Sequence, residues 1–167
     1  VERSRGLGDV YKRQIYFKAP ETGRFEYYKA KEKTSGAYRG DYFTMGDIGY
    51  RDSDGYYFLT GRSADTIISG GTNIYPQEID DVLLAHQSVA EVCCIGVPNE
   101  EWGEEVKAVI NLESGADEDA VRKELVQLAE AKLSGFKKPK TYEFWTEELP
   151  RLPTGKIQRN LVKKRFW

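Results

Sequence analysis

Two short segments carry charged residues suited to chemistry on phosphates and hydroxyl groups. Lys156 follows Gly155 within residues 150–159, so a turn can project its ammonium into a neighbouring site. A compact positive charge stabilises two anionic reactants that repel one another, such as a phosphate and a carboxylate. Asp47 follows Gly46 after a strand-like run, where its carboxylate can accept hydrogen bonds from two vicinal hydroxyls, as on a ribose. A Gly-Asp pair by itself is more typical of a plain turn.

Two further segments combine glycine or aromatic residues with charge. Residues 61–79 contain the pair Gly70–Gly71, which indicates a loop with backbone angles that other residues rarely adopt. Residues 135–140 form a basic turn in which Phe136 stands beside lysines. Such a turn can bind phosphate groups, although a solvated basic surface would explain the same charges.

The elements that must position these residues indicate a small α+β domain. The hydrophobic patterns predict strands, helices and a basic tail helix in this order: strand 65–69, helix from 75–76, strands 89–97 and 106–112, helix from 117–119, strand 142–145 and helix 160–166. This β-α-β-β-α-β order plus the tail helix is a domain of about 100 residues. We expect a polar loop over residues 98–104 and a loop over residues 70–73.

The segment before this domain is predicted to be β-rich, with short strands and turns over residues 15–60. It is too small to bury a core of its own, so we interpret the chain as the end of a longer protein. The expected domains are 15–61, the end of a larger N-terminal domain, and 62–167, a C-terminal domain. Residues 1–14 have no apolar core of a signal peptide and no periodicity, so we interpret them as a non-native or artefactual leader.

Composition and charge exclude several classes of protein. The longest apolar stretch, Val92–Val97, is far shorter than the roughly 20 residues of a membrane span, so we expect no integral membrane segment. The 25 basic and 27 acidic residues nearly balance, which argues against a dedicated nucleic-acid binder. Residues 132–167 nevertheless hold ten basic residues against three acidic ones, which indicates an anionic ligand or a solvated tail.

Cysteine and histidine are too few for a structural zinc site, so we predict no metal site. Cys93 and Cys94 are adjacent in a predicted strand, where their side chains point to opposite faces and do not form a disulfide with each other. The only histidine is His86. Together these residues favour a reducing cytoplasm as the location of the protein.

Taken together, the motifs resemble the adenylate-forming superfamily, which includes acyl-CoA synthetases, adenylation domains of peptide synthetases and luciferases. The resemblance extends over residues 15–167 and rests on the run 61–79 followed by the Gly155–Lys156 loop. Three further segments are most similar to an AMP-forming fatty-acyl-CoA synthetase: Asn73–Pro76, Glu101–Glu104 and Phe136–Pro139. The chain therefore resembles a C-terminal fragment of such an enzyme.

The resemblance implies a reaction in two steps. A carboxylic acid and ATP·Mg give an acyl-adenylate and pyrophosphate, and the thiol of CoA then displaces AMP. It implies that Lys156 is catalytic and bridges the acyl carboxylate and the α-phosphate, and that Asp47 and Arg62 bind the nucleotide. The small domain would then rotate about a hinge at Ala64. The residues assigned to the tunnel for CoA and its pantetheine chain are Gly70, Gly71, Trp102, Phe136, Lys138 and Lys140.

The sequence departs from the family pattern at two positions. Ala64 stands where the hinge residue is usually Asp or Lys, and Met45 rather than Thr precedes Gly46, with Thr44 one place earlier. No phosphate loop is recognised within residues 1–41. We therefore expect the Mg²⁺ ligands and the acyl pocket in a missing N-terminal domain, and no acyl-adenylate formation by the chain alone.

Two alternatives remain at this stage. The first is an adenylation domain that loads a carrier protein, although no serine-bearing carrier segment follows Trp167, which favours free CoA. The second is a non-catalytic module whose basic segment binds a partner or nucleic acid, which salt-sensitive binding to DNA would reveal. The ligase interpretation requires the amine of Lys156 to be exposed, on the face that carries Arg62 and the glycine pair.

Overall fold

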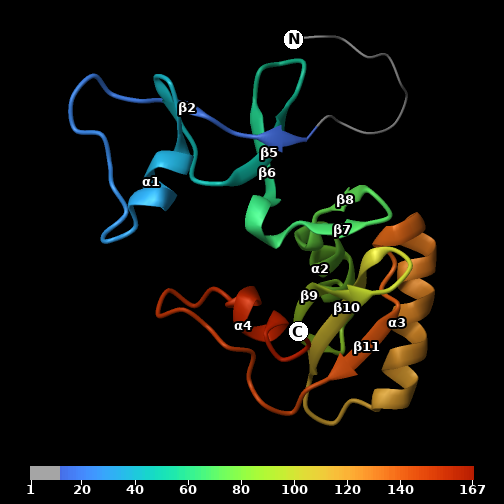
Figure 1. Cartoon of the computed structure of the whole chain (residues 1–167). Coiled ribbons are helices and arrows are strands. Elements are labelled where there is room, and N and C mark those ends of the chain that lie inside the picture. The colour runs from blue at the N-terminus through green and yellow to red at the C-terminus, as the bar shows by residue number, and fades with distance from the viewer. Residues whose placement is uncertain (1–11) are drawn as a thin grey trace. The chain divides into compact units, whose positions relative to one another are not determined.

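A computed structural model describes residues 12–167 (Figure 1). The chain consists of two units, and the boundary between them in the sequence follows Ala64. Unit 1 ends at Ala64 and unit 2 covers Asp65–Trp167. The expected boundary was 61/62, three residues earlier. Most of the expected leader lies outside the described residues, but Arg13 and Gln14 form a strand, so these two residues belong to the fold.

Unit 1 is built from two small antiparallel sheets. One sheet has the order β1-β5-β6 and the other β2-β4-β3. The bounds of these strands are β1 Arg13–Gln14, β2 Phe17–Lys18, β3 Tyr38–Arg39, β4 Tyr42–Phe43, β5 Asp47–Arg51 and β6 Tyr57–Arg62. The turn between β5 and β6 is closed by the side chain of Asp52, which accepts a hydrogen bond from the amide of Tyr56 at 2.8 Å.

One helix in unit 1 was not expected from the sequence. Helix α1 covers Lys31–Ala37, in a polar segment that contains Gly36 and has no apolar stripe. A local contact supports the helix, because Thr34 Oγ1 accepts a hydrogen bond from the amide of Tyr27 at 2.9 Å. Only Ala37 of this helix is buried. Hydrophobic periodicity gives no signal for so short and exposed a helix.

Unit 2 has the predicted α+β architecture. Its elements are β7 Ile67–Ser69, β8 Thr72–Ile74, α2 Pro76–Leu84, β9 Val89–Asn99, β10 Gly103–Leu112, α3 Glu118–Lys132, β11 Thr141–Phe144 and α4 Arg159–Lys163, with 3₁₀ turns at Ser63–Asp65 and Gly135–Lys137. Strand β10 pairs antiparallel with β9 along its whole length. On its other edge it pairs with β7 near Gly103 and runs parallel to β11 farther on. Apart from β8, the order is the predicted β-α-β-β-α-β with a tail helix.

Two of the predicted loops are partly strand. Residues 72 and 73, expected in a loop, form β8 together with Ile74; this strand pairs with β7 and buries Ile74 completely. The expected loop over 98–104 shortens to a tight connection, because β9 continues through Pro98 to Asn99. Among residues 12–167, β9 pairs with β10 alone, so its other edge has no ladder of hydrogen bonds that Pro98 could interrupt.

The two faces of the unit 2 sheet bury separate clusters. Helices α2 and α3 cover one face, with Ile79, Leu83 and Leu125 packed around Cys94. Helix α4 covers the other face, where Val162 packs with Cys93. The prediction that the two cysteines point to opposite faces is therefore confirmed, and both thiols are free. Within residues 12–167, no helix is long and apolar enough to cross a membrane.

The burial of the two cysteines predicts that they are unreactive in the folded chain. Burial raises the pKa of the Cys93 thiol to about 12 and that of Cys94 well above its ordinary range. Since the thiolate is the nucleophile, iodoacetamide at neutral pH should modify neither thiol of the folded chain and both after unfolding in urea. Mass spectrometry of intact protein measures this directly. Rapid alkylation of the folded chain would contradict the packing of β9.

Candidate functional site

The turn that carries Lys156 is a short β-hairpin. Arg151 and Ile157 form an antiparallel bridge, and the amide of Leu152 donates a hydrogen bond to the carbonyl of Lys156 at 2.8 Å. Gly155 closes the turn with φ +86°, a left-handed conformation that favours glycine. The side chain of Lys156 is exposed, as expected, and its ammonium has no ion-pair partner within the described part of the chain. The hairpin therefore presents a free positive charge.

One arginine fastens the base of this hairpin to the start of β9. Arg151 forms an ion pair with Glu91, and its Nη1 donates a hydrogen bond to the carbonyl of Gly155 at 2.6 Å. The side chain of Gln158 donates to the carbonyl of Arg151 at 2.8 Å, across the same hairpin. These contacts hold the two arms of the turn together and against the sheet.

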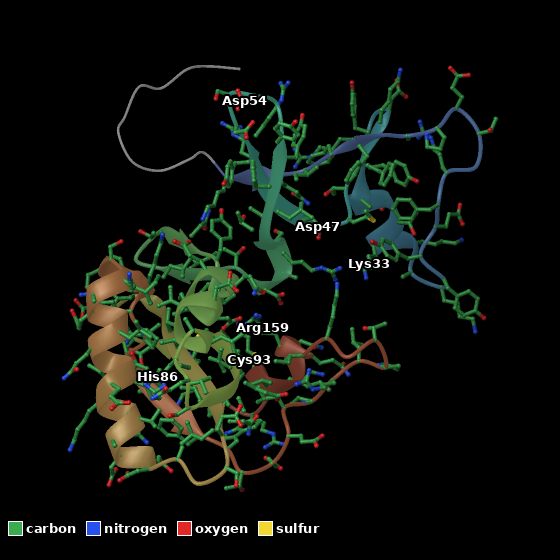
Figure 2. The ribbon with its side chains drawn as sticks, turned by 180° about the vertical axis from the view of Figure 1, so that it is seen from behind. Lys33, Asp47, Asp54, His86, Cys93 and Arg159 are labelled. Carbon is green, nitrogen blue, oxygen red and sulfur yellow. The ribbon has the colours of Figure 1, made fainter. Side chains whose placement is uncertain are left out.

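A second arginine, Arg159, follows the hairpin and pairs with a buried aspartate, and Figure 2 shows Arg159 beside Cys93. Arg159 Nη2 lies 2.6 Å from Asp80 Oδ2 on α2, and Nη1 donates to the carbonyl of Cys94 on β9. Burial opposes the charge of Arg159 and is the largest single effect on it, but the charge and hydrogen bond of Asp80, together with Cys93 and Cys94, outweigh burial and raise the pKa of the guanidinium. Burial also raises the pKa of the Asp80 carboxyl, against the opposing effect of Arg159. Neither residue was assigned a role from the sequence.

The predicted glycine pair forms the turn between β7 and β8. Gly70 and Gly71 have φ +54° and +77°, so the turn alone requires glycine at both positions. A Cβ on Gly70 would lie 2.9 Å from Trp102 Cε3 and 3.3 Å from Phe136 Cζ, whereas a Cβ on Gly71 would meet nothing within 4 Å. The rings of Trp102 and Phe136 pack with centroids 5.0 Å apart. The structure thus brings Gly70, Trp102 and Phe136 together and leaves Gly71 open.

The two lysines assigned to the same tunnel lie elsewhere. Lys138 forms an ion pair with Glu130 on α3. Lys140 is exposed. Both line a groove of about 480 Å³ between α3 and β11, to which Gly70, Trp102 and Phe136 contribute no atoms. Within unit 2, the six predicted tunnel residues therefore form two groups.

The two predicted nucleotide-binding residues are cross-strand partners in unit 1. Asp47 begins β5 opposite Arg62 at the end of β6, with Arg62 Nε 3.5 Å from Asp47 Oδ1. The Arg62 side chain is 65% exposed and that of Asp47 21% exposed. Thr44 is buried and accepts a hydrogen bond from the amide of Gly46 at 3.0 Å, so its hydroxyl stabilises the Gly-Asp turn. The sequence analysis did not predict that Asp47 and Arg62 lie opposite each other on neighbouring strands.

The predicted hinge residue lies at the end of unit 1. Ala64 is the middle residue of the 3₁₀ turn Ser63–Asp65, and the boundary between the units directly follows it. It is exposed, and no side-chain atom beyond Cβ restricts it. The amide of Ser63 donates to the carbonyl of Gly46 at 2.8 Å, which fastens the residue before it to the Gly-Asp turn.

Within unit 2, the Lys156 hairpin and the glycine turn lie at opposite ends of the β9–β10 pair. Arg151 reaches Glu91, near the start of β9, whereas Gly70 donates its amide to the carbonyl of Trp102, beyond the end of β9. Figure 1 shows the β11–α4 loop and the β7–β8 turn on different sides of this unit. The expectation that they share a face was wrong. A unit that rotates between two steps presents a different end in each, so its functional loops do not need a common face.

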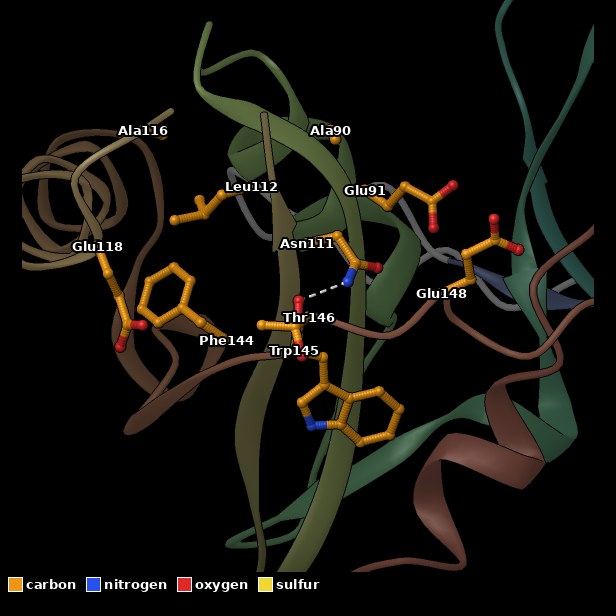
Figure 3. Close-up of a pocket in the computed structure, with 10 residues that line it drawn as sticks. All are labelled: Ala90, Glu91, Asn111, Leu112, Ala116, Glu118, Phe144, Trp145, Thr146 and Glu148. Carbon is orange, nitrogen blue, oxygen red and sulfur yellow. Dashed lines mark hydrogen bonds between the residues drawn. The ribbon is translucent and has the colours of Figure 1, made fainter. Parts of the chain in front are cut away.

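A cleft of about 520 Å³ lies between the starts of β9 and α3 and the end of β11 (Figure 3). None of the predicted site residues lines it; its lining residues are Ala90, Glu91, Asn111, Leu112, Ala116, Glu118, Phe144, Trp145, Thr146 and Glu148. The side chain of Asn111 lines the cleft, and its Nδ2 donates a hydrogen bond to the carbonyl of Trp145 at 2.7 Å. Over residues 12–167, no group of three or more His, Cys, Asp or Glu side chains is placed to hold a metal ion.

Comparison with known proteins identifies relatives over most of the chain. Residues 78–156 match the AMP-binding enzyme C-terminal domain. The sulfoacetate–CoA ligase of Cupriavidus necator is 42% identical over 136 residues, which is 80% of this chain and 26% of the ligase. The long-chain-fatty-acid–CoA ligase FadD13 of Mycobacterium tuberculosis is 37% identical over 168 residues, 99% of this chain and 31% of the ligase.

A solved structure agrees with these relatives. The amide bond synthetase McbA from Marinactinospora thermotolerans superposes with a TM-score of 0.80 at 30% identity, covering 96% of this chain and 32% of McbA. The chain thus spans about a quarter to a third of the length of the proteins it matches. It contains an AMP-binding enzyme C-terminal domain and belongs to the adenylate-forming enzymes.

Proposed function

We propose that the chain is the C-terminal part of an AMP-forming acyl-CoA synthetase. The enzyme would activate a carboxylic acid with ATP as an acyl-adenylate and then transfer the acyl group to the thiol of CoA. The observation that carries this proposal is the exposed ammonium of Lys156, held on an anchored hairpin at one end of a small unit. The names of the two CoA ligases that match most of the chain support the reaction class.

Lys156 acts in the first step. The carboxylate of the acid and the α-phosphate of ATP are both negative, and the ammonium placed between them offsets their repulsion in the transition state. No buried partner competes for this charge, because the side chain is exposed on its turn. Hydrogen bonds across the hairpin fix the backbone beneath it, including the 2.8 Å bond from Leu152 to Lys156. A preorganised cation needs little rearrangement when the reactants arrive.

Asp47 and Arg62 bind the nucleotide in this proposal. The carboxylate of Asp47 accepts hydrogen bonds from the ribose hydroxyls, while the mostly exposed guanidinium of Arg62 beside it contacts the nucleotide. Ala64 then serves as the hinge. Its small side chain allows large changes in φ and ψ without a clash, but it supplies no polar contact that would hold either orientation.

The second step uses the other end of unit 2. The backbone of Gly70 and Gly71, with Trp102 and Phe136 packed behind it, borders the path of the pantetheine chain. Lys138 and Lys140 border a separate groove, where Lys140 and the partly matched charge of Lys138 would attract the phosphates of CoA. We propose CoA as the acceptor because both relatives compared are named CoA ligases.

The partners in this proposal are the carboxylic acid, ATP, CoA and a large N-terminal domain of the same protein. Mg²⁺ enters with ATP as part of the substrate, and we assign its protein ligands to the large domain. The acid pocket would also lie in the large domain, so the identity of the acid is a property of that domain. We propose a cytoplasmic enzyme, with no nucleic acid among its ligands.

The proposal predicts that the chain by itself is inactive and becomes active beside a suitable large domain. The test uses a host ligase, FadD13 of M. tuberculosis, in which this chain replaces the matching 31%; the product is called the ligase chimera. With ATP, CoA and a long-chain fatty acid, the chimera should form acyl-CoA, detected by mass spectrometry, while the chain alone should not. Acyl-CoA formation that is equally fast without this chain, or absent from a folded chimera, would contradict the proposal.

A further inference from the structure

We propose that Arg159 is a positioning residue for Lys156, which holds the Lys156 hairpin in one orientation relative to α2, β9 and the start of unit 2. This inference rests on the proposed function, because it assigns Arg159 a part in placing the catalytic ammonium. Arg159 is the first residue of α4, three positions after Lys156. Its side chain is only 16% exposed, so it lies inside the unit rather than beside a ligand.

The guanidinium joins three elements in a closed ring of hydrogen bonds. It donates to Asp80 Oδ2 on α2 at 2.6 Å and to the carbonyl of Cys94 on β9. The other carboxylate oxygen, Asp80 Oδ1, accepts from the amide of Cys94 at 2.7 Å. A planar guanidinium can donate to two acceptors in fixed directions at once, which the single ammonium of lysine cannot reproduce. The ring therefore fixes the direction in which the chain enters α4.

The same guanidinium also faces the start of unit 2. Arg159 Nε lies 3.9 Å from Asp65 Oδ2, and Asp65 is the residue directly after Ala64. Arg159 thus links the proposed hinge boundary to the segment that carries Lys156. When unit 2 rotates, these contacts carry the hairpin with it as part of one body.

Helix α4 needs such fastening because it has only five residues. A helix this short is not stable by itself and takes its orientation from tertiary contacts. One turn after Arg159, Lys163 Nζ pairs with Glu104 Oε1 at 2.7 Å. The other oxygen of Glu104 accepts from the amide of Ile68 on β7 at 2.8 Å. Lys163 therefore secures the far end of α4, and Arg159 secures the end beside the hairpin.

The test compares Arg159→Lys with the unchanged ligase chimera in the two half-reactions. Lysine keeps a positive charge beside Asp80 but loses the second directed hydrogen bond, so the unit should fold while the hairpin shifts. A shift of about 1 Å at a reacting group lowers rates by about 100-fold. We therefore expect acid-dependent ATP–pyrophosphate exchange to fall by about 10- to 100-fold through kcat, with little change in the KM for ATP. Thioester formation from supplied acyl-adenylate should stay within about twofold, because Lys156 takes no part in it.

A matched control is available in the same basic tail. Arg165 pairs with Glu147 at the surface, with 49% of its side chain exposed, and its guanidinium lies over the ring of Trp145. Arg165→Lys should therefore leave both half-reactions within about twofold of the unchanged chimera, as expected for an exposed ion pair.

A second measurement uses the 167-residue chain itself and keeps the test informative if activity is weak. In Arg159→Lys, the amides of Leu152 and Gln158, which close the hairpin, should exchange with deuterium at least about tenfold faster. The amides that pair β9 with β10 should keep their protection. The double variant Arg159→Met with Asp80→Leu removes both charges and should fold. Its hairpin amides should exchange with deuterium as fast as those of Arg159→Lys.

Three outcomes overturn the inference. They are unchanged pyrophosphate exchange in Arg159→Lys, equal losses in both half-reactions with lost β9–β10 protection, and full adenylation by the double variant. The first and third would show that the hairpin needs no guanidinium, and the second that Arg159 serves overall stability. If Lys156→Ala also leaves pyrophosphate exchange unchanged, the proposed function fails; if only the Arg159 variants do so, the failure is limited to this inference.

Discussion

Replacing Lys156 by alanine in the ligase chimera is expected to slow acyl-adenylate formation by about 10²- to 10³-fold, the usual effect of removing one preorganised group that stabilises developing charge. The second half-reaction should persist, since the hairpin and the glycine turn lie at opposite ends of unit 2. The measurement is ATP–pyrophosphate exchange for the first step and release of AMP from supplied acyl-adenylate and CoA for the second.

A matched control for this variant is Lys164→Ala. Lys164 is another exposed lysine of the same tail, after the fastened part of α4, so its removal subtracts the same charge from the surface. Its effect on either half-reaction should be within about twofold. Equal losses of both half-reactions in Lys156→Ala would refute the assignment of Lys156 to the first step alone.

Replacing Gly71 by leucine is expected to have the opposite selectivity. The site around Gly71 is open, with nothing within 4 Å of an added Cβ, so a leucine side chain would project into the proposed path of the pantetheine chain. Thioester formation should fall by about 10²-fold, because a misplaced reacting group costs that much, while pyrophosphate exchange should change by less than about threefold. The same two assays measure both effects.

Gly71→Ala separates the blocked path from backbone strain. Both variants place a side chain at φ +77°, so both carry a strain of about 1 kcal/mol, but only leucine is long enough to fill the path. Alanine should therefore retain most of the thioester activity. If alanine and leucine are equally inactive, the glycine serves the turn and not the tunnel.

Local patterns predicted the parts of unit 2 whose signals lie close together in the sequence. The spacing of Val121, Leu125 and Leu128 indicated the inner face of α3, and Asp117 begins that helix by accepting hydrogen bonds from the amides of Asp119 and Ala120. Alternation along β9 placed the two cysteines on opposite faces. These features depend on residues within one turn or one strand, where periodicity is informative.

The parts that could not be predicted depend on contacts between distant residues. Arg159 and Asp80 are 79 positions apart, and Glu104 joins Ile68 to Lys163 across the unit. In the sequence, Arg159 is one of several charges in a basic tail, and Asp80 is an aspartate next to Ile79 in a predicted helix. Buried ion pairs leave no periodic pattern, because their partners are set by the topology of the sheet.

In the candidate site, too, local features could be predicted and contacts between distant residues could not. Positive φ values at Gly70, Gly71 and Gly155 agree with turns expected from glycine. The separation of the glycine turn from the Lys156 hairpin was not foreseen, since a motif gives the order of residues and not the end of the sheet on which each lies. The pairing of Lys138 with Glu130 was missed for the same reason.

The central claim is that this chain supplies the mobile ammonium by which a larger enzyme joins an acid to AMP. Its most direct test is acid-dependent ATP–pyrophosphate exchange by the ligase chimera, compared with the host's large domain alone. The account predicts that adding the chain raises exchange by about 10²-fold or more and that Lys156→Ala abolishes this gain. Exchange that is the same with and without the chain, or the same with and without the amine of Lys156, would contradict it.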